Sequence, residues 1–210
     1  MKKNWKVLLI TSVLTLLPIL AGVLLWKQLP AQMPSHWNAA GEIDGWSSKP
    51  FVVFGMPVII LAFHWICALA TLADPKKDQH SGKVLQVVFW MMPILCIVLS
   101  TFAYAAALGK EVRMEMWMPV LMGLLLTVVG NYLPKCKQNY TIGIKIPWTL
   151  SSEENWNKTH RFAGRLWVVS GIAMILTGFF GGFWISFGIM LLMVLAPVIY
   201  SFVLYRKGIS

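Results

Sequence analysis

Long apolar runs, separated by short polar segments, make up most of the chain. A helix needs roughly 20 apolar residues to cross a hydrocarbon core of about 30 Å, and six stretches of about this length carry almost no charge. This pattern predicts an all-α integral membrane protein with six transmembrane helices. The six runs are Val7–Trp26, Phe51–Leu72, Val84–Leu108, Met116–Leu133, Leu166–Phe180 and Trp184–Leu204.

Composition agrees with this pattern, because 58% of the residues are hydrophobic and only 12% are charged, outside the usual range of soluble domains. Three lysines precede the first run, as in a signal peptide. The run is too long for the apolar segment of a signal peptide, however, and no small-residue cleavage site follows it. We therefore expect it to be retained as a span. The cysteines at 67, 96 and 136 lie in or near spans, and we expect them to be reduced packing residues.

Lysine and arginine are distributed unevenly among the polar segments. Fourteen of the 18 lie in the N-terminal tail, the second loop, the fourth loop or the C-terminal tail, and four lie in the first and third loops. Since basic residues concentrate on the cytoplasmic side of membrane proteins, both termini are predicted to be cytoplasmic. The net charge of +10 then indicates contact with anionic membrane lipids, and we predict no direct binding of nucleic acid.

The predicted outer loop between the first two spans, KQLPAQMPSHWNAAGEIDGWSSKP, is rich in turn-forming residues and predicts a short hairpin or an ordered loop. Its tryptophans, Trp37 and Trp46, either rest at the membrane interface or face a ligand. His36, Glu42 and Asp44 would meet on a metal ion only if the loop folded back. No zinc-binding motif occurs elsewhere, and we predict neither a metal nor a cofactor.

Chemistry-bearing residues are scarce within the spans. His64 is the one ionisable residue well inside a run, and a lone histidine there is more typical of hydrogen-bonded packing than of a proton relay. The sequence contains no GxSxG motif and no HExxH motif. We therefore predict a protein that is not an enzyme.

The longest polar passage, Thr141 to Trp167, lies between the fourth and fifth spans. Ser151 and Glu154 have the spacing of a capping box, which predicts a helix that begins near Ser152 and runs into the fifth span. The basic side chains of this helix share one face, and its aromatic side chains form a parallel stripe. These features predict an interfacial amphipathic helix with aromatics at the headgroup level; a plain anchor for the span is the alternative. The basic residues are Lys158, Arg161 and Arg165, and the stripe contains Trp156, His160, Ala163 and Trp167.

The fifth span carries Gly164, Gly171 and Gly178 at intervals of seven residues. This spacing puts the three glycines on nearly one face of a helix, where the absence of side chains lets a neighbouring helix approach closely. The pattern predicts a packing seam.

Two stretches of the chain resemble the SdpI family of bacterial membrane immunity proteins. The first, GNYLPKCKQNYTIGIKIPWTLSSEENWNKTHRFAGRLW (Gly130–Trp167), is similar to the family signature; Lys145 and Ile146 stand where the family usually has Arg and Thr. The second, LPAQMPSHWNAAGEIDGWSSKP, is similar to the Pro-x-His-Trp-Asn-x-x-Gly pattern of the family's uncharacterised N-terminal domain. The resemblance covers essentially the whole chain and implies two halves, residues 1–83 and 84–210, with a signature segment at 130–167.

The resemblance implies a function. The best understood family member protects its producer against a secreted killing peptide and draws a cytoplasmic autorepressor to the membrane. We therefore expect a multi-pass protein of the bacterial cell membrane that confers resistance to an antimicrobial peptide toxin. We also expect contact with membrane lipids and, as a further partner, a cytoplasmic helix-turn-helix repressor. Two alternatives stay open: a membrane enzyme or flippase for a lipid-linked substrate, and a purely regulatory membrane receptor.

Three groups of residues are candidates for this function. The predicted toxin contacts in the outer loop are His36, Trp37, Asn38, Gly41 and Trp46. The predicted inner-face residues are Asn131, Pro134, Lys135, Asn139, Gly143, Lys145, Pro147, Trp148, Thr149, Trp156, Thr159 and His160. The predicted lipid or partner contacts are Lys158, Arg161 and Arg165.

Overall fold

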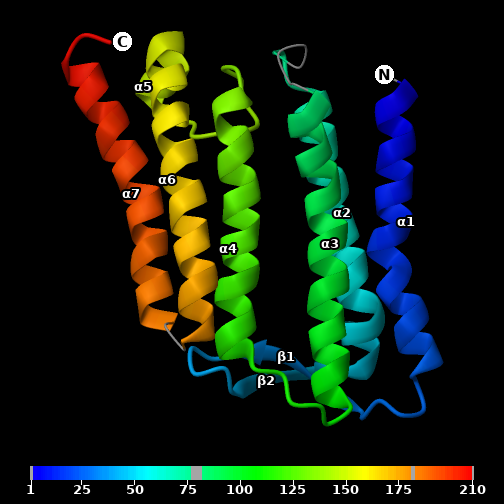
Figure 1. The fold of residues 1–210 in the computed structure, drawn as a ribbon. Coiled ribbons are helices and arrows are strands. Elements are labelled where there is room, and N and C mark those ends of the chain that lie inside the picture. The colour runs from blue at the N-terminus through cyan, green and yellow to red at the C-terminus, as the bar shows by residue number, and fades with distance from the viewer. Residues whose placement is uncertain (1, 77–81, 181–182, 210) are drawn as a thin grey trace. The chain divides into compact units, whose positions relative to one another are not determined.

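The computed structural model describes residues 2–76, 82–180 and 183–209, and most of these residues are helical (Figure 1). Within this part of the chain, six helical segments are long and apolar enough to cross a membrane. The predicted number of spans is confirmed, and the chain is a multi-pass membrane protein. The long helices are α1 (Lys2–Leu24), α2 (Met56–Leu72), α3 (Gly82–Ala107), α4 (Met114–Tyr132), α6 (Glu153–Phe179) and α7 (Phe183–Arg206).

Shorter elements connect these helices. Two antiparallel strands, β1 (Gln32–Trp37) and β2 (Ile43–Ser48), form the predicted hairpin. A π-helical turn, η1 (Phe51–Gly55), leads into α2. The 3-10 turn η3 (Leu133–Lys135) ends α4, and the short helix α5 (Pro147–Ser151) precedes α6.

The chain forms two compact units. Unit 1 contains Met1–Ala70 and Gln86–Met114, and unit 2 contains Thr71–Leu85 and Glu115–Ser210. Helix α3 therefore packs mainly with α1 and α2. The division into halves at residue 83 stays a prediction.

The core of unit 1 joins the hairpin to the helices. Met33 of β1 is fully buried, and it clusters with Val52 and Val53 of η1 and with Tyr104 of α3. In Figure 1 the hairpin lies at the end of unit 1 opposite the N-terminus of α1. The hairpin is thus packed against one end of unit 1.

Polar contacts hold the helices of unit 1 together. His64 is fully buried, and its Nε2 lies 2.9 Å from the hydroxyl of Thr11 in α1, as expected for a packing histidine. The Tyr104 hydroxyl donates to the carbonyl oxygen of Pro18 at 3.0 Å, and the Cys96 thiol donates to that of Thr15 at 3.3 Å. Such bonds between helices stabilise association in lipid, where no water competes for the polar groups.

The glycine seam predicted for the fifth span is confirmed in unit 2. A Cβ atom added to Gly171 would lie 2.6 Å from the carbonyl oxygen of Gly123, and one added to Gly178 would lie 2.9 Å from that of Met116. Helix α4 contributes its own glycines to the contact, since a Cβ on Gly130 would lie 3.0 Å from the carbonyl oxygen of Gly164. The backbones of α4 and α6 therefore pack in direct contact.

Candidate functional site

The turn of the hairpin is built by Asn38 and Gly41. The Asn38 side-chain oxygen accepts hydrogen bonds from the backbone N–H groups of Ala40 and Glu42, at 2.9 and 3.0 Å. Gly41 has a φ of 81°, a left-handed conformation that glycine adopts without strain. These two predicted contact residues thus shape the hairpin.

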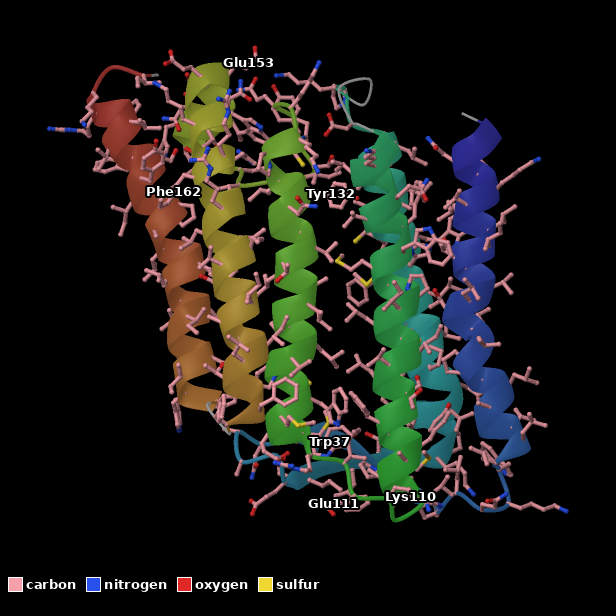
Figure 2. All side chains as sticks on the ribbon, in the orientation of Figure 1. Trp37, Lys110, Glu111, Tyr132, Glu153 and Phe162 are labelled. Atoms are coloured by element: carbon pink, nitrogen blue, oxygen red, sulfur yellow. The ribbon has the colours of Figure 1, made fainter. Side chains whose placement is uncertain are left out.

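The hairpin has a packed side and an exposed side. Trp37 is partly buried against the unit 1 core, and Figure 2 labels it at the same end of the unit as Lys110 and Glu111. Trp46 is 56% exposed. The exposed side, which we call the hairpin face, consists of His36, Asp44 and Trp46.

An imidazole–carboxylate pair is the main polar feature of the hairpin face. The Nδ1 atom of His36 lies 2.5 Å from Oδ1 of Asp44, and both side chains are well exposed. The Glu42 carboxylate instead accepts a hydrogen bond from the Asn38 amide at 3.0 Å. Among the described residues, no group of three His, Cys, Asp or Glu side chains is arranged to hold a metal ion.

In unit 2, the loop after η3 is organised around the side chain of Asn139, which is 1% exposed. Its amide nitrogen donates to the carbonyl oxygens of Lys137 and Ile142, and its oxygen accepts from the backbone N–H groups of Thr141 and Ile142, all within 2.9 Å. A single side chain therefore satisfies four backbone groups that have no sheet or helix partner.

The loop is closed by His160 and Trp156 of α6. His160 Nε2 accepts a hydrogen bond from the Ile144 N–H at 3.0 Å, while its Nδ1 donates to the carbonyl oxygen of Trp156 at 2.8 Å. The rings of Trp156 and His160 stack with centroids 4.0 Å apart, and the Trp156 indole N–H donates to the carbonyl oxygen of Cys136 at 2.8 Å. These bonds assign the Nδ1–H tautomer to His160 and occupy both ring nitrogens.

Gly143 allows the loop to reach this position. Its φ is 122°, and an added Cβ would lie in hard contact with Nε2 of His160 and 3.0 Å from the ring of Trp156. Only glycine combines this backbone conformation with so close an approach.

Helix α5 begins at Pro147, where the missing N–H costs nothing, and Thr149 anchors it. The Thr149 hydroxyl accepts from the Ile146 N–H at 3.1 Å and donates to the carbonyl oxygen of Ile144 at 2.7 Å. Trp148 packs against Phe202 and Tyr205 at the end of α7. Within the described part of the chain, the buried Trp148 indole nitrogen has no hydrogen-bond partner.

Burial also controls the chemistry of Cys136. This thiol lies beneath the loop and donates to the carbonyl oxygen of Tyr132. Removal from water disfavours the thiolate and raises the pKa of Cys136 to about 11. The thiol is therefore protonated and unreactive at neutral pH.

Two predictions for this segment are wrong in detail. The N-cap of α6 is Ser152, whose hydroxyl accepts from the Asn155 N–H at 3.2 Å, whereas the predicted cap, Ser151, bonds back to Trp148 in α5. The aromatic stripe does not lie among lipid headgroups, because Trp156 and His160 are at most 1% exposed. The helix is amphipathic and runs unbroken into the span as predicted, but its aromatic side faces the protein.

Sequence reasoning missed Asp74 and Gln138. Asp74 is 2% exposed, and its Oδ2 accepts from the Tyr140 N–H and from the Thr141 hydroxyl at 3.0 and 2.7 Å. The Gln138 amide donates to the carbonyl oxygens of Thr149 and Leu150. No local pattern marks the bonds that Asp74 makes to Tyr140 and Thr141 or those that Gln138 makes to α5, because these partners lie further along the chain.

Asn155 was also missed, although it links α6 to α7. It is fully buried, its amide donates to the carbonyl oxygens of Ser201 and Ile209, and its oxygen accepts from the hydroxyls of Ser201 and Thr159. Its position three residues after the N-cap Ser152 was only a weak indication in the sequence of a structural role. Thr159, a predicted inner-face residue, belongs to this buried network.

The remaining predicted inner-face residues are exposed, and they are Asn131, Pro134, Lys135 and Lys145. The ring of Pro134 also approaches Gly164 of α6. On α6, Lys158 forms an ion pair with Glu154 at 2.7 Å, and the exposed residues beyond it are Arg161 and Arg165.

Known proteins resemble this chain over nearly its whole length. A family model described as the SdpI/YfhL protein family matches residues 135–201, and a domain of unknown function (DUF1648) matches residues 13–61. The Immunity protein SdpI of Bacillus subtilis (strain 168) is 30% identical over 206 residues, which cover 98% of this chain and 96% of that protein. No solved structure matches. The predicted resemblance is confirmed: the chain belongs to the SdpI/YfhL protein family.

Proposed function

We propose that this protein confers immunity against a secreted peptide toxin. The observation that carries the proposal is the similarity, over nearly the full length of both chains, to a protein named as an immunity protein. The six apolar helices support a role in the membrane, where a membrane-active peptide would act. The proposed role is non-enzymatic: it requires binding and no turnover.

The hairpin face is the proposed contact for the toxin. Trp46 offers an exposed aromatic surface, and Asp44 lies beside it on the same strand with its carboxylate paired to His36. The one lysine next to β2, Lys49, directs its ammonium group to the carbonyl oxygens of Trp26 and Leu29. The face therefore presents an exposed indole beside one carboxylate, a combination that suits a cationic, amphipathic peptide.

Survival of a toxin-sensitive bacterium tests this proposal. Cells would express the wild-type chain or Trp46→Ala, and membrane levels would be matched before challenge with a panel of cationic membrane-active peptides. Because a central tryptophan contact contributes about 2 kcal/mol or more, we expect Trp46→Ala to lower the tolerated peptide concentration by roughly 30-fold. The matched control is Trp184→Ala, which removes an indole that is 75% exposed at the start of α7.

The outcomes separate the two parts of the proposal. If the wild-type chain protects against no peptide, immunity is rejected. If Trp46→Ala protects as well as the wild type, immunity stands and the hairpin face is rejected as the contact. Trp37→Ala and Trp148→Ala are less informative, because both side chains pack within the protein.

Tethering of a cytoplasmic repressor is the second part of the proposed function. It rests on the exposed surface of the loop after η3, where Tyr140 is 53% exposed and Lys135, Lys137 and Lys145 surround it along the chain. If a helix-turn-helix regulator is encoded beside this gene, its fluorescent fusion should move to the membrane when toxin is added. Tyr140→Ala should abolish the movement; a fusion that never reaches the membrane would reject tethering.

The enzyme or flippase alternative would place the headgroup of a lipid-linked substrate against residues 130–149, and its test is turnover that His160→Ala abolishes. In the structure both nitrogens of His160 are bonded to the backbone, so the ring would have to leave its loop before acting as a base. No observation favours this alternative over immunity.

A further inference from the structure

The exposed face of α6 changes character along its length. Val169, Ile172 and Leu176 are 67%, 48% and 56% exposed, as expected of a helix face that contacts lipid. One turn toward the N-terminus, the same face carries Arg165 and then Arg161, both exposed. The two arginines are four residues apart and therefore neighbours on the helix surface.

Neither arginine side chain has a protein counter-ion among the residues that the structure describes. The nearest acidic residue along this face, Glu154, is paired with Lys158 one turn beyond Arg161. Asp74, in the same unit, directs its oxygens to Lys76, Tyr140 and Thr141. Two adjacent positive charges thus lack a protein anion and repel each other.

Contacts between α6 and α7 show which part of α7 lies beside the two arginines. The ring of Phe162, labelled in Figure 2, stacks on Tyr200, with centroids 4.6 Å apart. The Trp167 indole N–H donates to the carbonyl oxygen of Met193 at 2.9 Å. Because α6 and α7 are antiparallel, Arg165 lies level with the part of α7 between Met193 and Tyr200.

That part of α7 is apolar on its exposed side. Leu195 and Ile199 are 53% and 60% exposed, and Phe202 and Val203 continue the apolar surface beyond Tyr200. Helix α7 extends to Arg206, about 9 Å past Tyr200 at 1.5 Å per residue. The two arginines therefore leave α6 at a level where the exposed surface of α7 is apolar, before α7 ends at Arg206.

A charge held at this level is costly unless it reaches an anion. Guanidinium groups bind phosphate through paired N–H donors, and two of them about 6 Å apart along the helix can share one phosphate group. We propose that Arg161 and Arg165 bind the headgroup phosphate of an anionic phospholipid whose acyl chains lie along Val169, Ile172 and Leu176. The headgroup of an anionic lipid such as phosphatidylglycerol fits, because it has a net negative charge and no ammonium group that the two guanidinium groups would repel.

Native mass spectrometry of the full-length protein tests this site. The protein would be purified in detergent with an equimolar mixture of phosphatidylglycerol and phosphatidylcholine, and the lipid retained after detergent release would be measured. The wild type should retain phosphatidylglycerol preferentially. Since each surface charge contributes roughly a fivefold change in lipid affinity, Arg161→Gln/Arg165→Gln should lower this retention at least fivefold.

The matched control is Lys135→Gln/Lys137→Gln, which removes the same charge from exposed residues after α4. It should lower retention clearly less than Arg161→Gln/Arg165→Gln does, because it removes charge without removing paired N–H donors. Arg161→Lys/Arg165→Lys keeps the charge and loses the paired donors, so its retention should be intermediate; this variant also decides the matter if the glutamine variant fails to fold. An excess of inorganic phosphate should not displace the lipid, because phosphate lacks the acyl chains.

Four results would overturn the proposal. The first is equal retention of the two lipids by the wild type. The second is unchanged retention in Arg161→Gln/Arg165→Gln, or in Arg161→Lys/Arg165→Lys if the glutamine variant does not fold. The third is an equal loss in the lysine control, and the fourth is displacement of the lipid by inorganic phosphate.

Discussion

The hairpin of unit 1 and the signature segment of unit 2 contain similar residues in different environments. Both have an asparagine whose side-chain oxygen accepts two backbone N–H groups, and both have a glycine with positive φ. They differ in their tryptophans: Trp46 is 56% exposed, whereas Trp156 is fully buried. The hairpin holds polar and aromatic groups outward on a rigid turn, while the signature segment uses them to fix its own loop.

This difference shows that residues of a family signature can have two roles, binding a partner or maintaining the fold. In the hairpin, His36 and Trp46 are available to a partner because Asn38 supplies the structure. In the signature segment, the side chains of His160 and Thr149 hold the loop in place, since their polar atoms are hydrogen-bonded to its backbone. Substitutions in the hairpin should therefore impair binding, whereas substitutions in the signature segment should impair folding.

Trp156→Ala should produce the largest effect on stability. It removes a fully buried indole, its hydrogen bond to Cys136 and its stacking on His160. Truncation of a buried tryptophan typically costs about 3–5 kcal/mol. We expect a lower yield of folded protein and a marked drop in the thermal unfolding temperature in detergent.

The matched variant is Trp46→Ala, which removes the same side chain from the hairpin face and should leave the unfolding temperature nearly unchanged. Equal destabilisation by the two variants would contradict the distinction between a structural and an outward-facing region.

Gly143→Ala should have the next largest effect. The added methyl group would collide with Nε2 of His160 and would hold alanine at a φ of 122°, and such backbone strain costs of order 1–3 kcal/mol. Gly188→Ala in α7, where nothing lies within 4 Å of the new Cβ, serves as the control and should be neutral or slightly stabilising. Thermal unfolding of both variants decides the point: a neutral Gly143→Ala would mean that the loop does not depend on this contact.

Thr149→Val tests the anchor of α5 at nearly constant shape. The Thr149 hydroxyl is fully buried and serves the backbone of Ile144 and Ile146, so its loss leaves buried backbone groups unpaired at a cost of about 1–3 kcal/mol. Thr101→Val is the comparison, since Thr101 is exposed and bonds only within its own helix. Urea unfolding should shift for Thr149→Val alone; a similar shift in both would point to a general effect of valine.

The parts of this fold that could be predicted are those with a local or periodic signal. Run length identifies the six spans, turn residues identify the hairpin, and a seven-residue glycine spacing identifies the α6 side of the α4–α6 seam. The direction of the Trp156–His160 stripe could not be predicted, because aromatic residues four apart look the same whether they face headgroups or protein. Contacts such as Asp74 with Thr141 join segments far apart in sequence and have no local mark.

The last prediction involves no change in protein stability. It concerns the alkylation rate of Cys136, which reports on burial of the loop. Burial raises the pKa of Cys136 from 9.0 to about 11, which lowers its thiolate fraction at pH 8 about 100-fold, and only the thiolate reacts. Alkylation of Cys136, followed by peptide mass spectrometry, should therefore be at least that much slower than alkylation of Ser151→Cys, an exposed position at the end of α5. The rate should rise steeply between pH 8 and 11, and Trp156→Ala should accelerate it by uncovering the loop. If Cys136 in the wild type reacted as fast as the exposed cysteine, the loop would be open in solution, and the contrast with the hairpin would fail.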